Sequence, residues 1–179
     1  MDRLARARRG ARGGAAMIPQ HVFDAWRADL DAREPRALEL AYALELTLPR
    51  ENEANARWGE LAQAENAAAL VSEDARALMQ FAYERYDAFR VGNFTPVELG
   101  NPNIFAFERA CAGERLLVVN NLARVLQPAK LTVYADRAGW DILNRVEFVF
   151  PPRAQLDAYE FLWLLLTDED ETQAATRLP

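Results

Sequence analysis

The sequence predicts an α+β fold in which an N-terminal helical segment packs on a C-terminal antiparallel β-sandwich. Between residues 20 and 90, apolar side chains recur at helical spacing. From about residue 93 onward, short β-rich runs alternate with Pro, Gly and Asn. Apolar residues make up 51% of the 179 residues, so the chain can bury a sizeable core.

Two amphipathic helices are predicted in the first part of the chain. Val22, Trp26 and Leu30 follow one another at intervals of four and form the apolar face of the first helix. Pro35 stands near the start of the second helix, where proline is tolerated, and Pro49 ends that helix.

The clearest helix is predicted over residues 73–90. Ser72 is a favourable N-cap, and Glu73 and Asp74 place negative charge in the first turn, where the helix dipole favours it. Gly92 is expected to end this helix.

The C-terminal part contains short runs with strand character between turn residues. Five or more short strands at regular spacing indicate an antiparallel sandwich. The predicted runs are NIFAFERA (103–110), RLLVVNNL (115–122), KLTVYA (130–135), WDILNRVEFVF (140–150, one or two strands) and YEFLWLLL (159–166).

Charge and composition divide the chain into four parts. MDRLARARRGARGG carries five Arg and one Asp, although the whole chain has a net charge of −6. An Arg-rich leader can bind nucleic acid or act as a presequence; we expect a disordered tail, with translation starting at Met1 or Met17. The predicted parts are a basic leader (1–16), a helical segment (17–92), a β-sandwich domain (93–167) and an acidic tail (168–179).

Several classes of site are excluded by the counts of Cys and His. Cys111 is the single cysteine and His21 the single histidine. An intramolecular disulfide, a Cys-based zinc site and a His–His metal motif are therefore impossible within this chain. We expect no metal and no cofactor, no membrane-spanning helix, and a cytoplasmic location.

A series of motifs follows in order along residues 70–167. It begins with SEDARALMQFAYERYDAFRVGNF (72–94), NPNIFAFER (101–109) and RLLVVNNLARVLQPAKL (115–131). Weaker elements follow in DILNRVEFVFPP (141–152) and YEFLWLLL (159–166). The series resembles the C-terminal β-sandwich domain of the α-amylase superfamily (glycoside hydrolase family thirteen), within it the trehalose synthase (maltose α-D-glucosyltransferase) type. The first motif resembles the junction between the last barrel helix and the sandwich.

The resemblance implies that the family's catalytic Asp nucleophile, Glu acid/base and transition-state Asp lie on a barrel upstream of this region. A (β/α)₈ barrel needs about 250 residues. Only about seventy residues precede the matching region, and their pattern is helical. We therefore expect a catalytic barrel to be absent, no catalytic residue to be present, and the chain not to be an enzyme by itself.

Acidic pairs are the first candidates for glycoside chemistry, which requires two carboxylates about 5 Å apart in retaining enzymes. Glu73 with Asp74 is interpreted as helix-start charge, and the DEDE run at 168–171 as a solvated tail. Neither pair is expected to be catalytic. His21 and Cys111 have no visible catalytic partners.

Aromatic and amide side chains are the candidates for sugar contact. Trp140 follows Gly139 at an expected loop edge and is the best candidate for stacking on a sugar ring. Trp163 lies in the last strand, where a core position is expected. Asn120 and Asn121 interrupt an apolar strand and are expected to bond to the backbone at the strand end.

These observations favour a non-catalytic accessory domain with a structural or docking role in α-glucan or trehalose metabolism. Its partner would be a separate α-amylase-type barrel or a second copy, and its own helices would cover the sheet face that a barrel covers in the full enzyme. An α-glucan-binding module is the alternative, and it predicts two exposed aromatics on one face. Nucleic-acid binding through the leader is a third hypothesis, which the acidic body disfavours.

Overall fold

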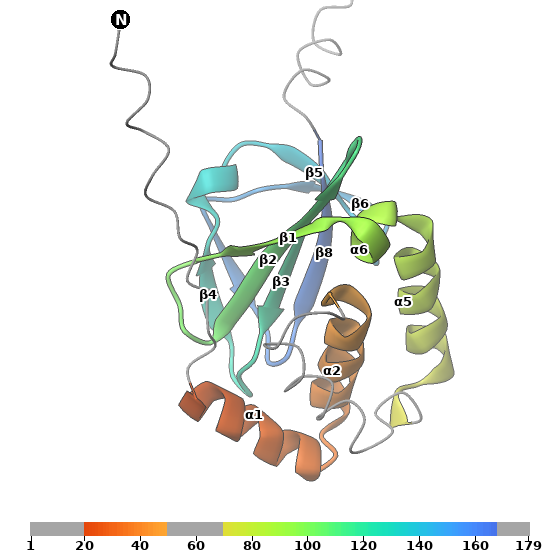
Figure 1. Ribbon diagram of the computed structural model, residues 1–179. Coiled ribbons are helices and arrows are strands. Elements are labelled where there is room, and N and C mark those ends of the chain that lie inside the picture. Colours follow the sequence, from red (N-terminus) through yellow and green to blue (C-terminus); the bar gives the residue numbers. More distant parts are fainter. Residues whose placement is uncertain (1–19, 50–69, 168–179) are drawn as a thin grey trace, which may run out of the picture.

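The computed structural model describes residues 20–49 and 70–167. The predicted basic leader (1–16) and acidic tail (168–179) lie outside these residues. Helices gather on one side of a twisted β-sheet, and a second, smaller pair of strands lies on the other side (Figure 1). The predicted fold class is confirmed.

The helices are α1 (Gln20–Asp31), α2 (Pro35–Thr47), α5 (Glu73–Arg85) and α6 (Asp87–Val91). The Glu34 carboxylate caps α2 by accepting a hydrogen bond of 2.7 Å from the Ala37 amide, with Pro35 in the first turn. As predicted, the Ser72 hydroxyl caps α5 at the Ala75 amide, and Gly92 follows the last residue of α6.

The prediction of one continuous helix over 73–90 is wrong, because the helix breaks at Tyr86. Tyr86 has extended backbone angles, φ −112° and ψ 116°. The amide of Ala88, in the first turn of α6, donates to the Glu114 carboxylate at 2.9 Å. The break turns α6 so that Ala88 and Phe89 are buried in the core that the helices share with the sheet.

A six-stranded antiparallel sheet has the order β1-β2-β3-β8-β5-β6, and β4 and β7 form a separate antiparallel pair. Strands β1, β4 and β7 were not among the predicted runs, since β4 shares only Lys130 with the run at 130–135, whereas the run at 140–150 does contain two strands. The bounds are β1 (Asn93–Val97), β2 (Ile104–Cys111), β3 (Glu114–Asn121), β4 (Gln127–Lys130), β5 (Ala138–Asp141), β6 (Val146–Val149), β7 (Arg153–Leu156) and β8 (Phe161–Leu166).

The predicted strand at 130–135 is also wrong, since its middle part forms the 3-10 turn η1 (Thr132–Tyr134). Leu131 and Tyr134 are buried, while Thr132 and Val133 are exposed. Buried positions three residues apart match the period of a 3-10 turn rather than the period of two of a strand. The Tyr134 hydroxyl is anchored by donating to the Glu108 carboxylate at 2.5 Å.

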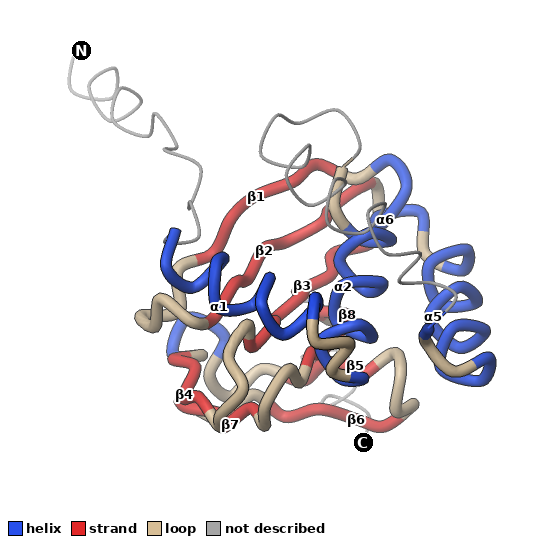
Figure 2. The backbone as a smooth tube through the Cα atoms, turned by 90° about the horizontal axis from the view of Figure 1, so that it is seen from below, coloured by secondary structure: helices blue, strands red, loops and turns tan. Residues whose placement is uncertain are grey.

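Both faces of the central strands are buried, and each face belongs to a different core. On β3, Leu116 and Val118 pack in the core that includes the helices, whereas Leu117 and Val119 pack against the β4–β7 side. Side chains alternate between the faces of a strand, so β3 serves both cores at once. Figure 2, which looks at the molecule from below, shows α1 and α2 in front of the strands, with α5 and α6 at one end.

Trp163 on β8 is a central residue of the core shared by helices and sheet. It is fully buried, and its ring centroid lies 4.8 Å from that of Phe89 on α6. No helix among the described residues is long and apolar enough to cross a membrane.

We expect Trp163→Ala to lower the free energy of unfolding by roughly 3–5 kcal/mol, because it leaves a large cavity at this contact. Trp140, whose side chain is 40% exposed, is the matched control. Trp140→Ala is expected to cost about 1 kcal/mol or less. Urea unfolding of both variants measures the difference, and equal losses would show that Trp163 does not anchor the core.

Candidate functional site

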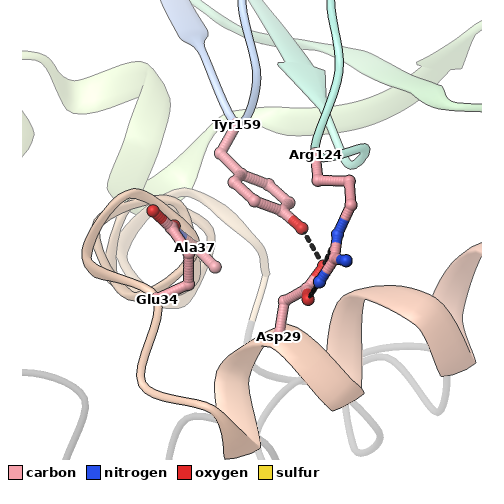
Figure 3. A network of polar contacts seen from close by, with 5 residues as sticks. All are labelled: Asp29, Glu34, Ala37, Arg124 and Tyr159. Carbon is pink, nitrogen blue, oxygen red and sulfur yellow. Dashed lines mark hydrogen bonds and ion pairs between the residues drawn. The ribbon is translucent and has the colours of Figure 1, made fainter.

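A polar junction joins the first helix to two loops of the sandwich (Figure 3). Asp29 on α1 accepts hydrogen bonds from the Arg124 guanidinium and from the Tyr159 hydroxyl. The contact links residues 95 and 130 positions apart in the chain. Asp29 is buried, with 4% exposure, whereas the side chain of Arg124 is 72% exposed.

Asn121, the last residue of β3, holds these two loops together. Its amide nitrogen donates to three carbonyls, those of Val125 (2.9 Å), Leu156 (3.2 Å) and Asp157 (2.7 Å). Its amide oxygen accepts from Ala123 at 2.9 Å. The side chain therefore fixes the loop after β3, which carries Arg124, against the loop before β8, which carries Tyr159.

Asn120, the neighbour of Asn121, also bonds to the backbone, since its amide nitrogen donates to the Phe105 carbonyl at 2.9 Å. Both asparagines are fully buried and bond to the backbone, as the sequence predicts.

Tyr159 has a backbone conformation that directs its side chain toward Asp29. Its φ of 58° lies in the left-handed region, which is uncommon for a residue with a side chain. The Tyr159 amide donates to the Ala123 carbonyl at 3.1 Å, which supports this conformation. Burial raises the pKa of the Tyr159 phenol above its ordinary value of 10.0, so the hydroxyl stays protonated and acts as a donor to Asp29.

A pocket of about 350 Å³ opens beside the junction. Among the described residues that line it, Asp29 is the only one with a carboxylate, and both oxygens of this carboxylate already accept hydrogen bonds. The pocket therefore lacks the pair of carboxylates that glycoside hydrolysis requires. The lining residues are Val22, Ala25, Ala28, Asp29, Asn103, Leu122, Ala123, Arg124 and Tyr159.

The other acidic candidates do not form an acid–base site among the described residues. Glu73 and Asp74 are exposed in the first turn of α5, beside the Ser72 cap. The run at 168–171 lies outside the described residues. In the described parts of the chain, no group of three or more His, Cys, Asp or Glu side chains could hold a metal ion.

Cys111 is not an activated nucleophile. Its thiol lies 3.9 Å from the Glu114 carboxylate. Desolvation, followed by the carboxylates of Glu114 and Asp87, raises the pKa of Cys111, whereas an activated cysteine needs a lowered pKa. His21 is exposed at the start of α1.

Trp140 lies on β5, away from the residues that line the junction pocket. Its cross-strand neighbours are Glu147 on β6 and Leu165 on β8. The other exposed aromatic among the described residues is Phe81 on α5, which has the Arg145 guanidinium 5.7 Å from its ring centre. The role of Trp140 in sugar binding stays a prediction.

The junction around Asp29 was not predicted from the sequence. The available signal is that Asp29 falls between Trp26 and Leu30 on the buried side of α1. A carboxylate at such a position requires a partner when the helix packs, because burying an unpaired charge is costly. The pattern could thus have indicated a polar contact, although not which residues make it.

The sandwich is similar to a domain of known proteins. Residues 94–163 match the family model for the maltogenic amylase C-terminal domain. Over 95 residues the chain is 32% identical to the trehalose synthase/amylase TreS of Mycobacterium tuberculosis, covering 48% of this chain and 16% of that protein. The chain thus spans less than a fifth of the length of these relatives.

Similar folds occur in two solved structures. Maltogenic amylase from S. marinus matches with a TM-score of 0.52 at 19% identity, covering 78% of this chain and 20% of that one. An Anoxybacillus α-amylase matches with a TM-score of 0.54 at 12% identity, covering 80% and 35%. The β-sandwich region (93–167) makes up less than half of this chain. Matches that cover 78% and 80% of the chain therefore also include part of the helical segment.

We expect Asp29→Asn to lower the free energy of unfolding by about 1–3 kcal/mol, because the buried contacts to Tyr159 and Arg124 weaken. A double-mutant cycle with Tyr159→Phe should give a coupling of about 0.5–3 kcal/mol. Asp87→Asn is the matched control, since its ion pair with Arg90 is exposed and should contribute less than about 1 kcal/mol. Additive effects of Asp29→Asn and Tyr159→Phe would contradict a cooperative junction.

Proposed function

From the premise that residues 94–163 are a C-terminal domain of the maltogenic amylase and trehalose synthase type, we propose that the chain is a non-catalytic accessory module. Its role is to dock onto an α-amylase-type catalytic unit in the cytoplasm, in α-glucan or trehalose metabolism.

The observation that carries this proposal is the single core that the helices share with one face of the sheet. Residues of α1, α2, α5 and α6 pack with residues of β2, β3 and β8 in one cluster. The chain thereby covers a sheet face that would otherwise require another domain. This construction suits a preformed module. Three carboxylates, those of Glu39, Asp157 and Glu160, do line a shallow pocket of about 290 Å³, but Asp157 is exposed and the Glu160 carboxylate already accepts a hydrogen bond from the Asp157 amide.

The outer surface of α5 and α6 is the favoured docking surface. This segment carries the motif that resembles the last helix of a catalytic barrel, and that helix would contact its barrel neighbours. Phe81 on α5 is 59% exposed and Val91 on α6 is 75% exposed. Large exposed apolar side chains are typical anchors of protein interfaces.

The docking role is tested with a trehalose-synthase-type enzyme whose own C-terminal domain has been deleted. We expect the full chain to bind this enzyme and to raise its activity or its melting temperature. Phe81→Glu should weaken binding at least tenfold, because a charge replaces an apolar anchor. Val125→Glu, at a position 55% exposed in the loop after β3, is the matched control and should bind normally.

Two results would contradict the docking role. The first is absence of both binding and stimulation by the folded wild-type chain. The second is turnover of maltose or trehalose by the purified chain alone, which would show that the module is itself catalytic.

An α-glucan-binding role is the second candidate, and the observation that favours it is the partial exposure of Trp140. A partly exposed indole ring on a strand can stack on a sugar, because its flat apolar face suits such a ligand.

Calorimetry with maltose, trehalose and longer α-glucans tests this role. If Trp140 binds sugar, saturable heat should disappear in Trp140→Ala and persist in Phe81→Ala, which removes the other exposed aromatic among the described residues. No heat with the wild-type chain would exclude binding of these sugars. Heat that persists in Trp140→Ala would show that the sugar binds at another residue.

A further inference from the structure

Arg109, near the end of β2, is a buried charge with an unusual set of partners. Only 2% of the residue is exposed. Its Nε donates to the Ala88 carbonyl at 3.1 Å and one Nη donates to the Phe89 carbonyl at 2.9 Å. The remaining nitrogen, Nη1, is buried and has no hydrogen-bond partner. Among the described residues, no carboxylate forms an ion pair with Arg109.

Within the described parts of the chain, the buried guanidinium of Arg109 thus lacks an ion-pair partner and one hydrogen-bond acceptor. Buried charges in proteins are normally paired, and a buried unpaired donor is costly. The two carbonyls of α6 supply partial charge but no full negative charge. Burial also lowers the pKa of Arg109, although arginine remains charged in proteins. The side chain therefore has both a free donor and an uncompensated positive charge.

Arg109 forms part of the wall of a pocket of about 360 Å³ between α2, α5, α6 and β2. Arg90 and Tyr83 also line this pocket, so its polar side chains are two guanidinium groups and one phenol. None of the described residues that line it is acidic, in a chain whose net charge is −6. The remaining lining residues are Leu46, Leu48, Pro49, Phe89, Val91 and Gly92.

Gly92 is required for the shape of this region. A Cβ at this position would lie 2.3 Å from the Ala88 oxygen and 3.0 Å from the Ala110 nitrogen, which is too close for any other residue without a shift of the backbone. The end of α6 can therefore approach β2 closely, and this approach brings the Ala88 carbonyl within reach of Arg109.

We propose that this pocket binds a small oxyanion, namely a phosphate group that is either free or carried on a sugar. The guanidinium of Arg109 would supply the buried positive charge and its free Nη1 donor. Tyr83 would supply a further donor, and so would the N–H groups of Arg90 that its exposed ion pair with Asp87 leaves available. Arginine side chains match phosphate oxygens well, because planar N–H groups form charge-assisted hydrogen bonds with them. This site includes neither Phe81 nor Trp140, although Val91 of the docking surface also lines it.

The test follows the Arg109 Nε–H signal by proton–nitrogen NMR of the full chain. This group is buried and hydrogen-bonded to Ala88, so its exchange with water is slow enough for it to be observed. We expect inorganic phosphate to shift the signal saturably, with a Kd in the millimolar range or tighter. Chloride at equal ionic strength should leave the signal unchanged.

Variants identify the donors. Tyr83→Phe keeps the ring that stacks on Phe89 and removes only the hydroxyl, and it should weaken phosphate binding roughly tenfold. Arg109→Lys keeps a positive charge but loses the planar fork, and it should abolish saturable binding. Tyr159→Phe removes a hydroxyl outside the pocket and is the matched control with unchanged affinity.

Glucose and glucose 6-phosphate distinguish the source of the phosphate. Tighter binding of glucose 6-phosphate than of inorganic phosphate, with no effect of glucose, would assign a phosphorylated sugar; equal affinities would assign free phosphate. The proposal is overturned if phosphate causes no saturable shift of Arg109 in the folded wild-type chain. It is also overturned if Tyr83→Phe and Arg109→Lys, both shown to be folded, bind phosphate as the wild type does.

Discussion

The central strands β2, β3 and β8 are apolar on both faces, and the need to cover both faces determines the architecture. Strands buried on both faces are nearly continuous apolar runs, as LLVV within β3 and FLWLLL in β8 show. One face is covered by the helices, and the other by the β4–β7 pair with the 3-10 turn. Without the helices, residues such as Phe107 and Trp163 would face water.

Polar residues then fix how the covering elements meet the sheet. Asp29 connects α1 to the loops at one end of the strands, through Arg124 and Tyr159. Arg109 connects β2 to α6 through two backbone carbonyls, those of Ala88 and Phe89. Apolar packing is not directional, whereas these hydrogen bonds select one arrangement of each helix on the sheet. One contact involves α1, the first helix of the layer, and the other involves α6, the last helix.

Local signals explain what the sequence predicted well. The four-residue spacing of Val22, Trp26 and Leu30 predicted α1, and Ser72 and Gly92 marked the helix start and the helix end. Strands β2, β3 and β8 were predicted because long apolar or alternating runs between turn residues are specific to strands.

Tertiary contacts explain what the sequence did not predict. The break at Tyr86 depends on Glu114, the first residue of β3. Its carboxylate accepts a hydrogen bond from the Ala88 amide in the first turn of α6. The 3-10 turn depends on Tyr134 reaching Glu108 on β2. The junction at Asp29 joins residues more than ninety positions apart, and no spacing rule relates them. Short strands such as β1 and β7 have little pattern of their own, since each depends on pairing with a partner strand.

The central claim is that helices and sandwich form one cooperative unit, and native-state hydrogen exchange tests it most directly. If the claim is correct, the buried amides of Trp26 and Leu30 on α1 and of Val118 on β3 should exchange with the same free energy of opening, equal to that of global unfolding. Exchange of the α1 and α2 amides at a much lower free energy, while β3 and β8 stay protected, would show that the helices are an addition that the sandwich does not need.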